Sequence, residues 1–180
     1  FIFSAEILGE VQNFYGIFKN WDTMLHTING FLCAAIGFSM IDILNRSEKF
    51  HAKMEPIFVA LVAFCFSMTV GVLWEFFEFS MDWFFGMDMQ KDWMVPAINS
   101  VKLNPTGANI PIHVDVQSVV INGETWNLGG YLDIGIVDTM KDLMVNFVGA
   151  VVFSVIGILY LTHRGKGKLA ASLIPQVRDT

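Results

Sequence analysis

Two long stretches without a charged residue limit most strongly what this chain can fold into. Residues 56–74 and 143–162 contain no Asp, Glu, Lys or Arg. An α-helix needs about 20 mostly apolar residues to cross the roughly 30 Å hydrocarbon core of a bilayer, and both stretches come to that length. We therefore predict two membrane-spanning helices, over about residues 56–80 and 138–162.

Two further segments resemble spans less completely. Residues 22–45 contain a shorter uncharged stretch, 27–40, that apolar residues extend at helical spacing, and we predict a third span there. Residues 1–18 carry Glu6 and Glu10 among large apolar side chains. This segment predicts the end of a fourth, partial span, whose beginning we expect to precede Phe1.

The composition suits lipid better than water. Hydrophobic residues make up 54% of the 180 residues and charged residues 16%, with a mean hydropathy of +0.53, whereas a soluble domain is about a quarter charged. Cys33 and Cys65 both lie in apolar runs and predict free thiols. The net charge of −6, with no basic stripe, argues against a nucleic-acid partner. We predict an all-α integral membrane helical bundle in contact with membrane lipids.

The distribution of basic residues predicts the orientation of the bundle, because Lys and Arg collect in cytoplasmic loops. The segment 46–55 contains three such residues and the tail 163–180 contains four. We expect both segments to be cytoplasmic and residues 83–131 to be extracytoplasmic. All five tryptophans then lie at or beyond the outer interface: Trp21, Trp74, Trp83, Trp93 and Trp126.

The long outer segment, residues 86–131, predicts structure of its own. Residues 114–121 have strand-like composition, and the pair Asn122-Gly123 follows them. This pair favours a two-residue type I′ turn, which needs positive φ at both central positions. We expect a small extracytoplasmic β-hairpin inserted between the last two spans.

Polar residues recur at helical spacing at one end of each predicted span. In the predicted orientation all three sets lie at the outer end, at matching depth. A carboxylate that faced lipid there would be costly, so we expect these side chains to face the interior of the bundle. The three sets are Asp22 and His26; Glu75, Glu78 and Asp82; and Asp138, Asp142 and Asn146.

Several carboxylates gathered in a bundle must be neutralised by protons, lysines or a cation. Oxygen-rich sites with one imidazole suit Mg, Mn or Ca, and Zn is also compatible. We predict a divalent metal site that acts on a lipid or lipid-linked substrate, with Glu78 and Asp138 as the catalytic carboxylates. The predicted metal ligands are Asp22, His26, Glu75, Glu78, Asp82, Asp138, Asp142 and Asn146.

Simpler interpretations remain open for many of these residues. Acidic residues near helix ends are often solvated at the headgroup level, which applies to Asp82, Asp88, Asp92 and Asp133. A single buried histidine is more often structural than a ligand, and Asp42 with Arg46 four residues later suggests an ion pair. At the level of function, a cation or proton pathway and a non-catalytic membrane scaffold are the alternatives. A homo-oligomer is compatible with each of these functions.

Three motifs resemble a known group of proteins. They are Trp-Asp-Thr-Met-Leu-His at 21–26, Trp-Glu-Phe-Phe-Glu-Phe-Ser-Met-Asp at 74–82, and Asp-Thr-Met-Lys-Asp-Leu-Met-Val-Asn-Phe-Val-Gly-Ala at 138–150. The chain resembles the YjdF-like family of uncharacterised bacterial inner-membrane proteins and, more distantly, VanZ-like proteins. The resemblance implies a polytopic protein of the bacterial cytoplasmic membrane with further spans upstream. It implies no activity.

Overall fold

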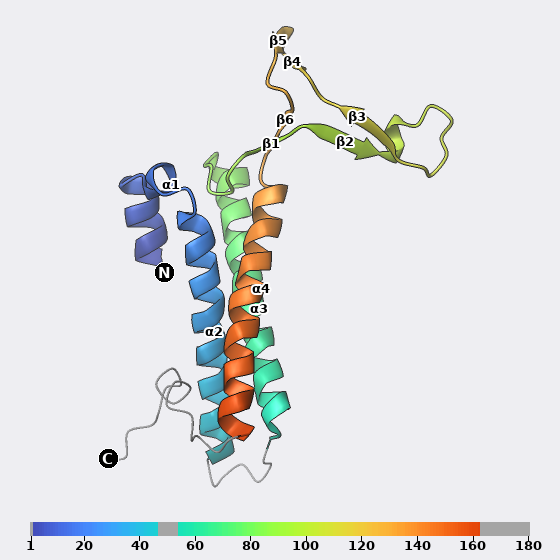
Figure 1. Cartoon of the computed structure of the whole chain (residues 1–180). Coiled ribbons are helices and arrows are strands. Elements are labelled where there is room, and N and C mark those ends of the chain that lie inside the picture. The colour runs from blue at the N-terminus through green and yellow to red at the C-terminus, as the bar shows by residue number, and fades with distance from the viewer. Residues whose placement is uncertain (1, 47–53, 163–180) are drawn as a thin grey trace. The chain divides into compact units, whose positions relative to one another are not determined.

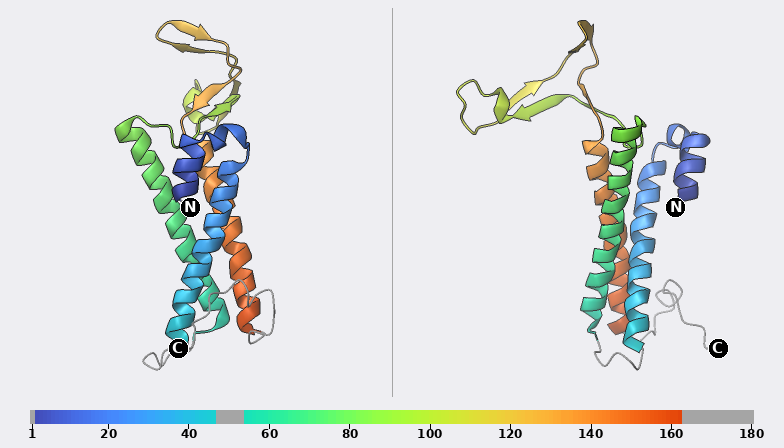
Figure 2. Two further views of the ribbon diagram at one scale, coloured as in Figure 1. Left: turned by 90° about the vertical axis from the view of Figure 1, so that its left-hand side faces the viewer. Right: turned by 180° about the vertical axis from the view of Figure 1, so that it is seen from behind.

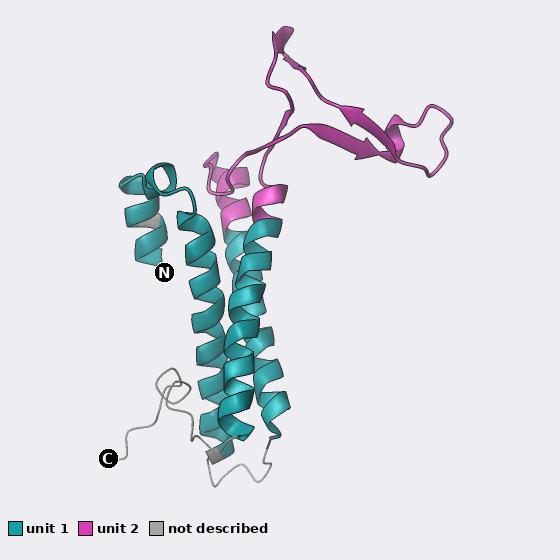
Figure 3. Ribbon diagram, in the orientation of Figure 1, with its two compact units in different colours: residues 1–77, 140–180 teal, residues 78–139 magenta. Residues whose placement is uncertain are grey.

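The computed structural model describes residues 2–46 and 54–162 (Figure 1). The chain divides into two compact units (Figure 3): unit 1 comprises residues 1–77 and 140–180, and unit 2 comprises residues 78–139. The predicted cytoplasmic tail, 163–180, and most of the predicted cytoplasmic loop lie outside the described residues. Each unit is described by itself below.

Three long helices dominate the described residues: α2 (Trp21–Arg46), α3 (Pro56–Phe85) and α4 (Ile136–Thr162). Each is long and apolar enough to cross a membrane, judged by length and composition. The three helices predicted at 22–45, 56–80 and 138–162 are therefore present, and α3 continues to Phe85. Within unit 1 they run side by side (Figures 1 and 2).

The outward faces of these helices are apolar and their inward faces include small and polar residues. On α2, every fourth residue is a large apolar side chain that is at least 41% exposed. His26, Ser67 and Asn146 are buried by contrast. This distribution is the reverse of that in a water-soluble helical bundle, where the apolar stripe faces the core. The exposed stripe on α2 comprises Met24, Ile28, Leu32, Ile36 and Met40.

Glycines let α2 and α4 approach very closely. A Cβ atom added to Gly30 would lie 2.2 Å from the backbone oxygen of Asn146, and one added to Gly149 would lie 2.2 Å from that of Thr27. Small residues permit such backbone approach between membrane helices. The Ser67 hydroxyl of α3 also donates a hydrogen bond of 2.7 Å to the Gly30 carbonyl oxygen. These contacts determine how the polar faces of the three helices are rotated toward one another.

The first described residues form short helices. The π-helix η1 (Phe3–Val11) is followed by α1 (Phe14–Ile17), with Asn13 between them at φ 56°. The Trp21 indole N–H donates to the Ser4 carbonyl oxygen at 3.3 Å, so η1 is tied to the start of α2. Nine residues are too few to cross a bilayer by themselves. That residues 1–18 form the end of a longer span stays a prediction.

Unit 2 contains three separate antiparallel strand pairs. The outermost pair in sequence, β1 with β6, encloses the other two, so the chain leaves α3, forms two successive hairpins and returns to α4. The strands are β1 (Trp93–Val95), β2 (Ala97–Ser100), β3 (Ile112–Asp115), β4 (Val119–Ile121), β5 (Glu124–Trp126) and β6 (Tyr131–Asp133), with the short 3-10 helix η2 (Val101–Leu103) after β2.

The structure confirms one hairpin and corrects the strand that precedes it. Asn122 and Gly123 have φ values of 52° and 88° and join β4 to β5, as the Asn-Gly pair predicts. The prediction of a single strand over residues 114–121 was wrong. This segment is divided between two strands: β3, which pairs with β2, and β4, which pairs with β5. The Val116 N–H bonds instead to the Pro96 oxygen at 2.8 Å. Proline has no N–H to continue a ladder, so the pairing is interrupted where Pro96 separates β1 from β2.

Candidate metal centre

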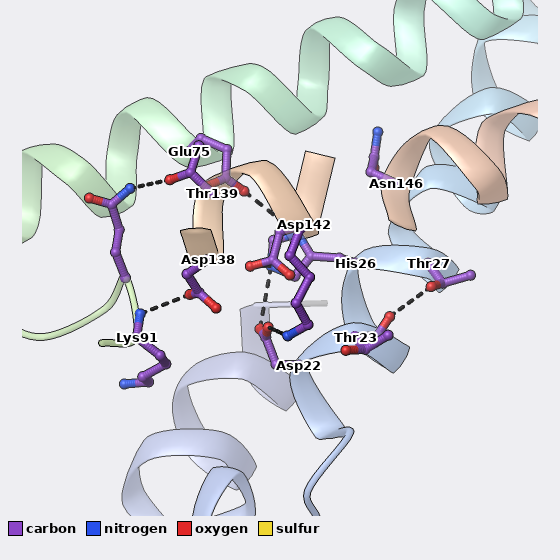
Figure 4. Close-up of polar contacts among 12 residues, drawn as sticks. Asp22, Thr23, His26, Thr27, Glu75, Lys91, Asp138, Thr139, Asp142 and Asn146 are labelled. Atoms are coloured by element: carbon purple, nitrogen blue, oxygen red, sulfur yellow. Dashed lines mark hydrogen bonds and ion pairs between the residues drawn. The ribbon is translucent and has the colours of Figure 1, made fainter. Parts of the chain in front are cut away.

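His26 lies among three carboxylates within unit 1 (Figure 4). Its Nε2 atom is 3.5 Å from Asp22 Oδ1, one turn earlier on α2. The same nitrogen is 3.8 Å from Asp142 Oδ2 on α4, and Nδ1 is 3.7 Å from Glu75 Oε1 on α3. Residues far apart in the sequence therefore bring acidic groups from three helices to one imidazole ring.

Most side chains of this cluster are buried. The side chains of His26, Glu75 and Asp142 are 4%, 5% and 1% exposed, and that of Asp22 is 18% exposed. Buried carboxylates repel one another and lose their hydration, so they need protons or positive charge. The Lys141 ammonium lies 3.7 Å from Asp22 Oδ2 and supplies one charge at the rim of the cluster.

The separations between these atoms suit a shared metal ion. One donor atom each from Asp22, His26 and Asp142 lies within 4.8 Å of the other two. Two atoms bound to the same ion at about 2.0–2.2 Å lie about 3–4 Å apart. The distances of 3.5 and 3.8 Å from Nε2 to the two aspartates fall in this range and exceed an ordinary hydrogen bond.

Glu75 faces the other nitrogen of the ring. A histidine that binds metal through one nitrogen almost always donates its second N–H to a carboxylate, a carbonyl or water, which orients the ring. Glu75 Oε1 lies 3.7 Å from Nδ1, longer than a hydrogen bond, so a carboxylate is near that nitrogen without bonding to it in this structure. The cluster thus has the composition of a metal site with an orienting carboxylate, and Asp22, His26 and Asp142 are the residues that could hold an ion together.

Asn146 lies one turn farther along α4 than Asp142 and is 1% exposed. Its side-chain amide nitrogen donates to the backbone carbonyl oxygen of Ser67 at 3.5 Å. Its Oδ1 atom is buried and accepts no hydrogen bond from the described residues. A buried acceptor without a donor costs about 1–3 kcal/mol. The amide oxygen is therefore suited to a water molecule or a ligand, and its predicted role as a metal ligand stays a prediction.

Other predicted site residues make contacts within unit 2. Both carboxylate oxygens of Asp82 accept backbone N–H groups, from Met89 at 2.6 Å and Gln90 at 2.8 Å, which closes the turn after α3. Asp138 accepts the Lys91 backbone N–H at 2.8 Å and the Trp93 indole N–H at 3.3 Å. These two carboxylates hold the start of the outer segment.

Glu78 is buried on α3, one turn after Glu75, and belongs to unit 2. Its predicted role as a metal ligand and catalytic base remains a prediction, as do the metal-binding roles of Asp82 and Asp138 and the catalytic role of Asp138. The hydrogen bonds of Asp82 and Asp138 already supply a structural reason for those two acids to be where they are. They are therefore weaker candidates than the acids around His26.

Sequence reasoning missed three contributors to this region. Lys141 contacts Asp22 across the α2–α4 interface, and the spacing of residues within one helix does not predict this contact. Gln90 is buried and donates a hydrogen bond to Thr139 Oγ1. Asp133 is 8% exposed, and its Oδ2 atom accepts the Val137 N–H at 2.8 Å at the start of α4. An acidic residue just before a helical run is a capping signal that could have identified this last role.

Comparison with known proteins points to a family of predicted membrane proteins. The family model described as "Predicted membrane protein (DUF2238)" matches residues 1–163. An uncharacterized protein of Thermotoga maritima is 31% identical over 81 residues, which are 45% of this chain. The chain spans 40% of the length of that relative. No solved structure matches the chain.

Proposed function

This chain belongs to the DUF2238 family of predicted membrane proteins, and we propose that it binds one divalent metal ion within its helical bundle and acts there on a lipid or lipid-linked phosphate. Asp22, His26 and Asp142 hold the ion, and Glu75 orients the imidazole. Mn²⁺ and Zn²⁺ fit this donor set better than Mg²⁺ or Ca²⁺, because they accept imidazole as well as carboxylate ligands.

One observation carries this proposal: a buried histidine contacts carboxylates from all three long helices at 3.5–3.8 Å. A purely structural imidazolium could neutralise only one of these three negative charges. Lys141 neutralises a second from a more exposed position, 32% exposed at its side chain. A divalent cation between Nε2 and the two aspartates would bring the positive charge that the three carboxylates need beyond that of Lys141. It would also account for the 3.5 and 3.8 Å distances from Nε2 to the aspartates.

Three protein ligands leave coordination positions open for water and substrate, as in catalytic metal sites generally. A metal ion held by these residues would supply Lewis-acid chemistry, which polarises a phosphoryl oxygen or lowers the pKa of bound water. The Lys141 ammonium, 32% exposed at the rim of the site, adds a positive charge that favours an anionic headgroup there. Phosphate chemistry therefore suits this site better than chemistry on a neutral substrate.

A cation or proton pathway receives less support from the same helices. Buried polar residues continue beyond the cluster with Asn29, Ser67 and Asn146. Farther along, however, Phe38 and Phe153 are fully buried, with ring centroids 5.8 Å apart, in an apolar cluster that includes Ala34, Ala63 and Ala150. A conducting route would need polar groups or water at that level.

Metal analysis of purified protein tests the proposal. We expect wild type to retain about one equivalent of Mn²⁺ or Zn²⁺ after dialysis, and the His26→Ala variant to lose it, measured by inductively coupled plasma mass spectrometry. His113→Ala is the matched control, because His113 is exposed and also lies within 3.2 Å of an aspartate. Equal metal content in wild type and His26→Ala protein would refute the site.

A further inference from the structure

A lateral groove lies within unit 1 beside η1, α2 and α3. It has a volume of about 370 Å³ and is lined by Ile2, Asn29, Val70, Leu73 and Trp74. Ligand pockets commonly have volumes of about 300–1,000 Å³, so the groove can hold a small ligand or part of a larger one. In both orientations of Figure 2, η1 runs beside the first half of α2.

The groove is apolar and open at its rim. Leu73 is 58% exposed and projects from a surface of α3 that is rich in exposed apolar side chains. In a membrane protein such surfaces face lipid, so the groove opens sideways to the hydrocarbon region. Its one strongly polar member, Asn29, is 9% exposed and accepts a hydrogen bond from the Cys33 thiol at 3.4 Å.

Two residues that line the groove are neighbours in sequence of residues in the proposed metal centre. Asn29 follows His26 by three residues on α2, so the two side chains lie on adjacent turns of one face. Trp74 directly precedes Glu75 on α3. The polar end of the groove therefore lies within one helical turn of groups that surround the imidazole.

We propose that the lateral groove binds the acyl chain of a phospholipid whose phosphate reaches the metal centre. This inference rests on the proposed function, since it assigns the substrate class of that site. An acyl chain gains little by moving from bilayer to groove, because lipid tails are already an apolar solvent. The groove acts by alignment: it selects a lipid with an extended chain beside its phosphate and holds that phosphate at the ion.

Photo-crosslinking of the full chain in nanodiscs tests this assignment. The nanodiscs contain phosphatidylethanolamine and a phosphatidylglycerol that carries a diazirine in one acyl chain, and mass spectrometry identifies the labelled residues. Val70→Trp fills the groove, and Leu61→Trp is the matched control on the same helix, at a position that is 56% exposed. We expect Val70→Trp to lower labelling of Leu73 and Trp74 severalfold, and Leu61→Trp to leave it unchanged.

The inference is overturned if Val70→Trp and Leu61→Trp proteins show equal labelling of Leu73 and Trp74, or if these residues are labelled no more than outward-facing Leu61 in wild type. Either result means that only bulk lipid is present, or that another part of the protein fills the groove. Metal analysis of the same samples separates the two proposals. Loss of metal in His26→Ala with no effect of Val70→Trp refutes the groove alone, whereas blocked labelling with metal retained in His26→Ala refutes the metal centre alone.

Discussion

At the scale of single residues, the two nitrogens of His26 face different kinds of partner. Nε2 faces Asp22 and Asp142, while Nδ1 faces Glu75. An imidazole can bind one ion through one nitrogen and donate a hydrogen bond through the other. In the proposed metal site, this division gives ligand roles to the aspartates and an orienting role to the glutamate, so substitutions at the two kinds of residue should affect metal binding differently.

Glu75→Gln should weaken metal binding without abolishing it. An amide still accepts a hydrogen bond from the ring but polarises it less, and loss of such orienting partners typically costs about 10–100-fold in metal affinity. Asp142→Asn, in contrast, should remove binding because it removes a charged ligand. Titration with Mn²⁺ followed by electron paramagnetic resonance measures both affinities. Glu55→Gln is the control, because Glu55 directly precedes α3, the helix that carries Glu75. Equal losses of metal affinity in Glu75→Gln and Asp142→Asn would contradict the division of roles.

Asp92 in unit 2 should make the stability of the outer segment depend on pH. Asp92 is an exposed residue, yet the small desolvation of its carboxyl group, together with the charges of Asp88, Asp133 and Asp82, raises its pKa, and Lys91 lowers it in part. Because the folded state then binds this proton more tightly than the unfolded state, stability falls as pH rises from the ordinary aspartate range through the raised pKa.

Asp92→Asn should remove this pH dependence. Hydrogen exchange of the β1 amides across the acidic range measures it, as the change in protection with pH. We expect a flatter profile for Asp92→Asn and an unchanged one for Glu124→Gln, which replaces an exposed acid in the same unit. A profile for Asp92→Asn as steep as that of wild type would show that other carboxylates cause the dependence.

At the scale of elements, close packing of α2 against α4 brings the proposed metal ligands together. Gly30 and Gly149 each face backbone atoms of the opposite helix at distances that exclude a Cβ atom. Asp22 and His26 lie on the turns of α2 before this contact, and Asp142 lies on the turns of α4 before it. The spacing between the two helices therefore sets the distance between the ligands.

Gly149→Leu should disturb both stability and metal binding. Inserting a side chain into a packed helix interface typically costs about 1–3 kcal/mol, and the helices must separate to admit it. Thermal unfolding followed by circular dichroism, with metal content measured in parallel, should show a lower midpoint and less bound metal. Val148→Leu changes the neighbouring outward-facing residue, which is 53% exposed, and should leave both unchanged. An unchanged unfolding midpoint and metal content in Gly149→Leu would mean that α2 and α4 are packed less closely at Gly149 than the structure shows.

At the scale of the whole molecule, the net charge of −6 is the sum of different charges on the two sides of the membrane. In the predicted orientation, the inner side has seven basic and four acidic residues, and the outer side has four basic and thirteen acidic residues. This distribution follows the tendency of Lys and Arg to remain on the cytoplasmic side. In that predicted orientation, the proposed metal centre lies at the acidic, outer end of the bundle, where divalent cations would be concentrated.

The orientation can be tested by labelling introduced cysteines in intact bacterial cells. With Cys65 replaced by Ser, we expect Thr106→Cys to react with a membrane-impermeant maleimide and Ser47→Cys to react only after the cells are permeabilised. Mass shifts of the purified protein report the labelling. The opposite pattern would place the acidic end of the bundle in the cytoplasm and would require a cytoplasmic source for the substrate.

Local patterns were sufficient to predict several features. The uncharged runs predicted α2, α3 and α4, because helix length and hydropathy are properties of contiguous residues. The Asn122-Gly123 pair predicted the β4–β5 turn, because positive φ is a property of those two residues. The same helical spacing placed Asp22 beside His26 and Asp142 one turn from Asn146.

Only the tertiary structure decided which polar groups meet. Spacing treated Asp82 and Asp138 as equal to Asp142, yet Asp82 and Asp138 bind backbone and indole N–H groups of the outer segment, while Asp142 lies at the imidazole of His26. Sequence period determines which residues share a face of one helix. How that face is rotated toward its neighbours depends on the packing of all three helices at once, here on contacts as small as the missing side chain of Gly30.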